Sequence, residues 1–206
     1  MAQVYEKLLA VEFYRLPEHV QKAHLAPPLF SVPVKQDGDT FHLSKPSELD
    51  HPADQALIPK LGIKSWRDSG VLGVIYEGVN IRSILDPLLS APTKAQQLMA
   101  HAWIESNTPL RVHLMPYVDF SEVSEVRFLA NRNSCQRISI CLRGQSAKNL
   151  EAALPKITAF AVDIIQHLPD RSHILELAYL STGEIRLVEV NPGLTPQDIA
   201  ELQRLN

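Results

Sequence analysis

The sequence predicts an α+β fold (α/β in the broad sense) that contains antiparallel strands. Two segments, 81–89 and 157–168, place apolar residues at helical spacing. Several shorter apolar runs, bounded by polar or glycine-containing turns, are typical of strands. With 206 residues, of which 45% are hydrophobic, the chain can bury a substantial core and is not expected to be disordered.

The first quarter of the chain carries short elements. Residues 1–28 predict two helices, the second ending at a pair of prolines. Strands are expected over 29–34 and 40–43, joined by the turn sequence KQDGD. Residues 44–55 have the composition of a linker. We therefore assign 1–50 to an N-terminal extension made of helices and a hairpin.

The middle of the chain predicts a strand followed by two helices. The run VLGVIY at 71–76 favours the strand, and 81–89 favours the first helix. The second helix is expected to begin at a capping box that runs from Thr93 to Gln96, because both side chains can then satisfy free backbone groups of the first turn.

More strands and a long helix are predicted in the second half. Strand candidates at 110–118, 124–130 and 136–142 have short polar connections, which are typical of an antiparallel meander. A long amphipathic helix follows, with Pro155 in its first turn. We assign the rest of the chain, 51–206, to the main domain.

Composition and charge argue against several classes of protein. The formal net charge is −3 and no block of lysine and arginine occurs, so nucleic-acid binding is not predicted. No run of 18 apolar residues occurs, so no membrane span is expected. Two cysteines without a C-x-x-C spacing, and an N-terminus without a cleavage-like site, favour a cytoplasmic setting. The eight histidines show no zinc-enzyme spacing.

Two glutamates lie inside the apolar strands of the C-terminal hairpin. With a turn centred on Thr182 and Gly183, antiparallel pairing joins residues whose numbers sum to 365, so Glu176 faces Glu189. Opposed side chains have Cβ atoms about 4.5 to 5.5 Å apart, and like charges at that separation are destabilising. A divalent cation between the two carboxylates removes this conflict.

An amide extends this pair to a possible set of three ligands. Period-two alternation places Ile185, Leu187, Glu189 and Asn191 on one face of the last strand. Together with Glu176 these oxygens suit Mg²⁺, which prefers hard oxygen ligands and shares substrate phosphates.

The alternative for the two glutamates is structural. Each carboxylate can form an ion pair with an arginine such as Arg127 or Arg137, because ion pairs also occur within sheets, or it can lie at the solvent edge. The pattern of the hairpin leaves both possibilities open.

Basic residues supply possible phosphate contacts. The segment PKLGIKSWRDS carries Lys60, Lys64 and Arg67, and Arg82 lies where a helix is expected to begin. Free backbone N–H groups at such a boundary can meet an anion together with a basic side chain. Lysine and arginine are usually surface residues, so a solvent-exposed role is the alternative for each.

The terminal sequence VEVNPGLTP resembles the last motif of the ATP-grasp superfamily, as found in D-alanine ligases. In that motif an acidic residue and an asparagine two positions later hold magnesium beside the nucleotide phosphates. The resemblance implies an ATP-grasp fold over 51–206, in which a small lobe, 51–115, and a C-terminal lobe, 116–206, enclose a nucleotide cleft. It also implies that Glu189 and Asn191 are metal ligands and that Glu176 is the third.

The order PKL, EVR, QR and EVNP is similar to the pattern of the eukaryotic ATP-grasp chaperones that assemble translation initiation factor two, and to related bacterial and phage ATP-grasp proteins. The similarity covers about 57–195. It implies that Lys60 and Arg82 bind phosphates and that Arg127 lies near them. It further implies an adenine-binding hinge made by backbone groups of Met115, Pro116, Tyr117 and Val118.

The sequence departs from the chaperone pattern at three of these positions. Arg82 stands where that family has a lysine, and Glu176 and Glu189 stand where it has aspartates. Arginine binds phosphate with a planar fork rather than as a point charge, so the phosphate geometry is expected to differ.

The resemblance implies ATP and Mg²⁺ as cofactors and leaves two functions open. The first is an ATP-dependent carboxylate–amine ligase that acts through an acylphosphate, with Lys60 and Arg127 stabilising the transferring phosphoryl group. Its substrate would be an unknown carboxylate or a protein. The alternative is an ATP-binding assembly chaperone, or interaction factor, which has a protein partner and no ligase turnover.

Overall fold

The computed structural model describes residues 2–66 and 73–204. Arg67, and the first two residues of the strand expected at 71–76, lie outside the described residues. At 73–76 only an isolated bridge is present, from Ile75 to Leu57. The described part of that segment is therefore not a regular strand, and the prediction was wrong there.

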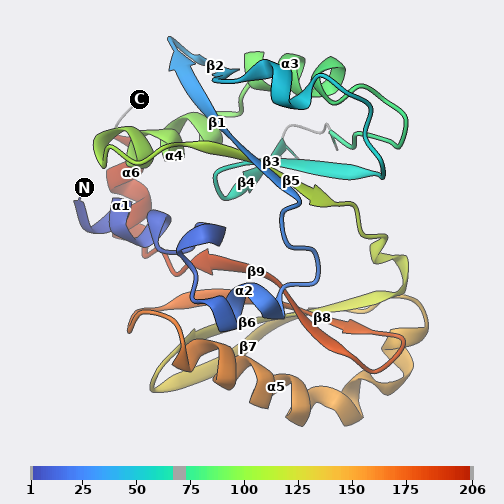
Figure 1. Cartoon of the computed structure of the whole chain (residues 1–206). Helices are drawn as coiled ribbons and strands as arrows, with labels where there is room; N and C mark the ends of the chain where they lie inside the picture. The colour runs from blue at the N-terminus through green and yellow to red at the C-terminus, as the bar shows by residue number, and fades with distance from the viewer. Residues whose placement is uncertain (1, 67–72, 205–206) are drawn as a thin grey trace. The chain divides into compact units, whose positions relative to one another are not determined.

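The chain forms two compact units. Unit 1 comprises residues 1–5, 26–117 and 201–206, and unit 2 comprises residues 6–25 and 118–200. Each unit has its own antiparallel sheet (Figure 1). The predicted α+β class is confirmed. No helix among the described residues is both long and apolar enough to cross a membrane.

Unit 1 has a five-stranded antiparallel sheet in the order β2-β1-β5-β3-β4. Its strands are β1 (Phe30–Asp37), β2 (Thr40–Leu43), β3 (Leu57–Leu61), β4 (Lys64–Ser65) and β5 (Arg111–Pro116). The predicted hairpin is confirmed, because β1 and β2 pair from Val34↔Leu43 to Asp37↔Thr40. These two strands, which fall in the predicted N-terminal extension, belong to the same sheet as β3.

Two amphipathic helices supply the core of unit 1. They are α3 (Ile81–Ser90) and α4 (Lys94–Glu105), and the one-turn helix η2 (Pro46–Leu49) precedes them. The predicted capping box of α4 is present, with Thr93 and Gln96 each accepting from the other's backbone N–H. Trp66 and Trp103 are each 1% exposed, and the Trp66 indole N–H donates to the Leu88 carbonyl at 2.9 Å.

Unit 2 has a four-stranded antiparallel sheet in the order β7-β6-β8-β9. Its strands are β6 (Val123–Asn131), β7 (Ser134–Cys141), β8 (His173–Leu180) and β9 (Ile185–Pro192). The long helix α5 (Leu150–Gln166) runs across one face of this sheet (Figure 1) and buries Ile157, Ala161, Ile164 and Ile165. Strand residues such as Phe128, Leu175 and Leu187 form the sheet's side of this core.

Short helices complete the chain: α1 (Ala2–Leu9), η1 (Phe13–Arg15), α2 (Glu18–Ala23), η4 (Phe120–Glu122), η5 (Gly144–Asn149) and α6 (Pro196–Gln203). The α2 segment lies at the edge of the unit 2 sheet, where Leu25 N–H donates to the Leu187 carbonyl at 2.7 Å. Lys7 and Asp198 form an ion pair at 2.7 Å within the same unit.

Two further predictions are corrected by the structure. The expected three-strand meander does not form, because β5 pairs with β1 and β3 in unit 1 whereas β6 and β7 pair in unit 2. Pro155 is the sixth residue of α5 rather than part of its first turn, because η5 leads directly into a helix that begins at Leu150.

Candidate functional site

The glutamates on β8 and β9 face each other, as the sequence predicts: Glu176 and Glu189 are Cα partners in the ladder. The turn differs from the prediction, since Leu180 N–H donates to the Glu184 carbonyl at 2.9 Å and encloses three residues. Gly183 has φ +85°, a conformation that favours glycine. The ladder shifts between Glu176 and Leu177, which leaves Val188 as an extra residue. This bulge restores the predicted register.

The bulge also changes which residues share a face. Leu177 pairs with Leu187 on the side covered by α5, whereas Glu176 pairs with Glu189 on the opposite side. The prediction that Ile185 and Leu187 share a face with Glu189 and Asn191 was therefore wrong. A bulged residue reverses the alternation beyond it.

The side chains of Glu176, Glu189 and Asn191, which we call the oxygen cluster, lie together on this second face. The Asn191 amide Nδ2 donates to Glu176 Oε1 at 3.2 Å and to Glu189 Oε2 at 3.1 Å. One amide group thus connects both carboxylates. It reduces the conflict between two like charges on neighbouring strands.

Arg127 is the fourth member of this neighbourhood. It is the Cα partner of Glu176 on β6, and its Nη2 donates to Glu176 Oε2 at 3.3 Å. The Arg127 side chain is 48% exposed, whereas that of Glu176 is 14% exposed. An exposed arginine of this kind contributes little to stability. Arg137, the other arginine considered, is the Cα partner of Phe128.

The ligand chemistry of the oxygen cluster fits Mg²⁺. The two carboxylates both lie within hydrogen-bond distance of the Asn191 amide. All three side chains carry hard oxygen atoms, which Mg²⁺ prefers. The nitrogen and oxygen of an amide exchange places by a half-turn, so Asn191 can donate to the carboxylates or offer its oxygen to a cation.

Lys60 is half-buried on β3 of unit 1, opposite His113 on β5. His113 is 2% exposed, and its Nδ1 forms a hydrogen bond with Ser31 Oγ at 2.7 Å. Ser31, His113 and Lys60 therefore form a polar row across neighbouring strands β1, β5 and β3. Sequence reasoning missed this row, because the sheet order that creates it is not visible in any local pattern.

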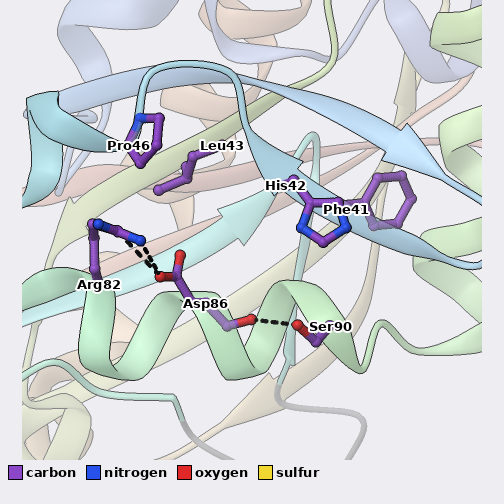
Figure 2. Close-up of a pocket in the computed structure, with 7 residues that line it drawn as sticks. All are labelled: Phe41, His42, Leu43, Pro46, Arg82, Asp86 and Ser90. Atoms are coloured by element: carbon purple, nitrogen blue, oxygen red, sulfur yellow. Dashed lines mark hydrogen bonds and ion pairs between the residues drawn. The ribbon is translucent and has the colours of Figure 1, made fainter.

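Arg82 is the second residue of α3, and its side chain pairs with Asp86 of the same helix. Its guanidinium donates to Asp86 Oδ2 through Nε at 3.1 Å and Nη2 at 2.9 Å (Figure 2). The expected free N–H groups are capped, since Asn80 Oδ1 accepts from the backbone of Arg82 and Ser83. The adjacent pocket has a volume of about 240 Å³. Ligand pockets usually measure about 300 to 1,000 Å³, so this one is small for a nucleotide.

The predicted adenine hinge lies where the chain leaves unit 1. Strand β5 ends at Pro116, and the division between the units falls between Tyr117 and Val118. Met115 is buried and Tyr117 is exposed, while Tyr117 N–H donates to the Ala56 carbonyl at 2.9 Å. The backbone N–H of Tyr117 is therefore already used within unit 1.

The structure brings the predicted residues together in part. Arg127, Glu176, Glu189 and Asn191 form one contiguous group on unit 2. Lys60, Arg82 and the hinge residues Met115 to Tyr117 belong to unit 1, where Arg82 forms its contacts on a helix rather than on the sheet.

Comparison with known proteins gives a match at the level of the fold. No family model and no curated protein matches this sequence. The chain is similar to Cdc123 from Schizosaccharomyces pombe, with a TM-score of 0.57 and 14% identity over 97% of this chain and 92% of that one. A C-terminally truncated form of the same protein gives a TM-score of 0.59 and 13% identity over 91% and 85% of the two chains.

A weaker similarity is to N5-carboxyaminoimidazole synthase from Aspergillus clavatus in complex with ADP and 5-aminoimidazole ribonucleotide. Its TM-score is 0.45 at 13% identity, over 94% of this chain and 47% of that chain. The fold of the present chain is that of Cdc123, an ATP-grasp-like fold, and the resemblance inferred from the motifs is confirmed at this level.

Proposed function

We propose that this protein binds ATP with Mg²⁺ and uses the bound nucleotide to set a conformation for assembly with a protein partner. The observation that carries the proposal is the oxygen cluster, in which one amide lies between two opposed carboxylates. Like charges on neighbouring strands repel each other, and a cation bound between them removes the repulsion that the Asn191 amide only reduces. A cation held by carboxylates can in turn neutralise nucleotide phosphates.

Each member of the cluster has a distinct role in this proposal. Glu176 and Glu189 supply charged oxygen ligands, and Asn191 supplies a neutral one after its amide has turned. The ion, when bound, supplies positive charge to the phosphates. Arg127 forms an ion pair with Glu176 in the structure, and its exposed guanidinium is free to move to a phosphate when a cation neutralises Glu176.

The remaining assignments rest on the motif resemblance. We assign Lys60 to a phosphate contact, and Met115, Pro116, Tyr117 and Val118 to the adenine hinge. The contacts of Arg82 with Asp86 do not support its role as a phosphate ligand, because its charge is already neutralised by a neighbour one helical turn away.

Two functions were expected from the motifs, and the fold favours the second. The similarity to Cdc123 extends over nearly the whole length of both chains. This supports an assembly or interaction factor over the carboxylate–amine ligase.

A turnover assay separates the two functions. The protein is incubated with Mg·ATP and a pool of carboxylate metabolites, and the release of ADP or AMP is followed. We expect the parent to bind nucleotide stoichiometrically. Its release of ADP or AMP should not exceed that of a Glu176→Gln/Glu189→Gln variant. Sustained ADP release that depends on one carboxylate metabolite, and that is lost in the double variant, would favour the ligase function instead.

A further inference from the structure

A second group of metal-binding side chains lies on unit 2, away from the oxygen cluster. His19, Asp163 and His167, which we call the imidazole cluster, place one ligand atom each within 4.8 Å of the others. His19 Nε2 lies 2.8 Å from Asp163 Oδ2, and His167 Nε2 lies 4.0 Å from Asp163 Oδ1. The two imidazole rings lie 4.2 Å apart between centroids. Both nitrogens thus approach the same carboxylate.

The three residues come from two elements that the chain brings together. Asp163 and His167 are four positions apart at the end of α5, so they occupy neighbouring places on one side of that helix. His19 comes from α2, 144 positions from Asp163. All three are exposed, whereas α5 buries its opposite side against the sheet.

The ligand set indicates the kind of ion. Two imidazole nitrogens and one carboxylate oxygen suit zinc and similar divalent transition metals, and Mg²⁺ prefers sets made of oxygen alone. In a tetrahedral zinc site with bonds of about 2.0 to 2.2 Å, ligand atoms lie roughly 3.3 to 3.6 Å apart. The 2.8 and 4.0 Å separations, which run to the two oxygens of Asp163, lie on either side of that range, and the three exposed side chains can rotate.

We propose that His19, Asp163 and His167 bind a zinc-class divalent transition metal ion, with solvent in the fourth position. The ion ties the N-terminal segment, residues 6–25, to α5. This segment is otherwise held to unit 2 by contacts that include the Leu25–Leu187 backbone hydrogen bond and the Lys7–Asp198 ion pair. The site is separate from the proposed Mg·ATP site and does not depend on it.

The proposal is tested by titrating Zn²⁺ into the full chain, after dialysis against a chelator, in buffer containing millimolar Mg²⁺. Calorimetry is run on the parent and on His19→Gln, His167→Gln and His42→Gln variants. His42 is a matched control, because it is an exposed histidine of unit 1 that lies outside the cluster. The Glu189→Gln variant serves as a control for the oxygen cluster.

We expect one equivalent of Zn²⁺ to bind the parent, the His42→Gln variant and the Glu189→Gln variant with similar affinity. Loss of either cluster histidine should weaken binding at least about tenfold, since even the loss of outer-shell partners of a metal ligand costs about 10- to 100-fold. Cleavage by trypsin after the exposed residues Arg15 and Lys22 should slow when Zn²⁺ is bound, only in proteins that retain both histidines.

Two results would overturn the proposal. One is the absence of a Zn²⁺ equivalent in the parent, which would make the cluster a set of surface ion pairs. The other is an unchanged affinity in both His19→Gln and His167→Gln, which would place any bound zinc elsewhere. Neither result bears on the proposed function, because Mg²⁺-dependent ATP binding is measured separately and does not use these residues.

Discussion

The oxygen cluster and the imidazole cluster belong to the same unit, but they are built in different ways. Glu176, Glu189 and Asn191 are neighbours in one β-hairpin, and their positions follow from a strand register. His19 meets Asp163 and His167 only through the packing of α2 near α5. The ligands of the oxygen cluster are hard oxygen atoms, mostly from charged carboxylates. Those of the imidazole cluster are mainly histidine nitrogens. The difference predicts different ions, Mg²⁺ for the first and zinc for the second.

The largest effect is expected when both carboxylates of the oxygen cluster are neutralised. In a Glu176→Gln/Glu189→Gln variant, Mg²⁺-dependent ATP affinity should fall at least about 100-fold, because two charged ligands are lost and each is expected to matter at least about tenfold. Zinc affinity at the imidazole cluster should not change. Calorimetric titration of both ligands measures this, and a parallel loss of zinc binding would show that the two clusters are not separate.

The next effect separates a metal ligand from a structural hydrogen bond. Asn191→Asp replaces the amide that donates to Glu176 and Glu189 with a third carboxylate. Without metal, the free energy of unfolding should fall by about 1 to 3 kcal/mol, because two hydrogen bonds become repulsions. Added Mg²⁺ should restore the loss.

Urea unfolding with Mg²⁺ and with a chelator measures this difference. Asn133→Asp is the matched control, because it adds the same charge at an exposed position in the β6–β7 turn. That control should change stability by less than about 0.5 kcal/mol in both buffers. If Asn191→Asp were equally unstable with and without Mg²⁺, the cluster would not be a cation site.

A smaller effect distinguishes Lys60 from Arg82, which both belong to unit 1. Lys60→Gln should weaken Mg·ATP binding about tenfold, as expected for one charge-assisted hydrogen bond. Arg82→Gln should weaken it less than about threefold, because Arg82 is already paired with Asp86. Fluorescent-nucleotide competition gives both values, with thermal melting as the folding control. If Arg82→Gln weakened Mg·ATP binding more than Lys60→Gln, Arg82 would be assigned to the phosphate site.

The smallest effect concerns the attachment of the N-terminal segment at acid pH. Burial alone would raise the pKa of Asp198, but hydrogen bonds from Lys7 and Thr195 outweigh it and lower the pKa from 3.8 to about 2. A depressed carboxyl pKa stabilises the fold above pH 3.8, and this contribution is lost as the pH falls towards about 2.

Lys7→Gln removes the cation, so acid unfolding should begin at higher pH than in the parent. Circular dichroism during acid titration measures the midpoint. Glu18→Gln is a suitable control, since the exposed Glu18–Lys22 pair should contribute little to stability. Equal midpoints for the parent and Lys7→Gln would remove this contact from the attachment of residues 6–25.

The oxygen cluster was predictable from sequence because strand pairing is a local property. The prediction that Glu176 faces Glu189 was nevertheless reached through two errors that cancel, since the three-residue turn shifts the register by one and the bulge at Val188 shifts it back. The face of Leu187 was mispredicted, because a bulge gives no signal in a pattern of alternation. Arg127 was identified by motif, and its contact with Glu176 follows from the β6–β8 pairing.

Contacts between distant segments could not be predicted in the same way. The four-residue spacing of Asp163 and His167 on a predicted helix was a visible signal for two of the three residues of the imidazole cluster, but His19 joins them only through tertiary packing. The same limit explains why β5 was predicted to pair with β6, since short connections suggest pairing between consecutive strands. In the structure β5 pairs with β1 and β3, which come from earlier in the chain.

The most direct test of the proposed function is a calorimetric titration of ATP into the parent protein, once with millimolar Mg²⁺ and once with a chelator. We predict a single binding event with Mg²⁺ and an affinity at least about tenfold weaker without it, because the phosphates would then meet Glu176 and Glu189 without an intervening cation. The same affinity in both buffers would contradict the assignment of the oxygen cluster as the Mg·ATP site.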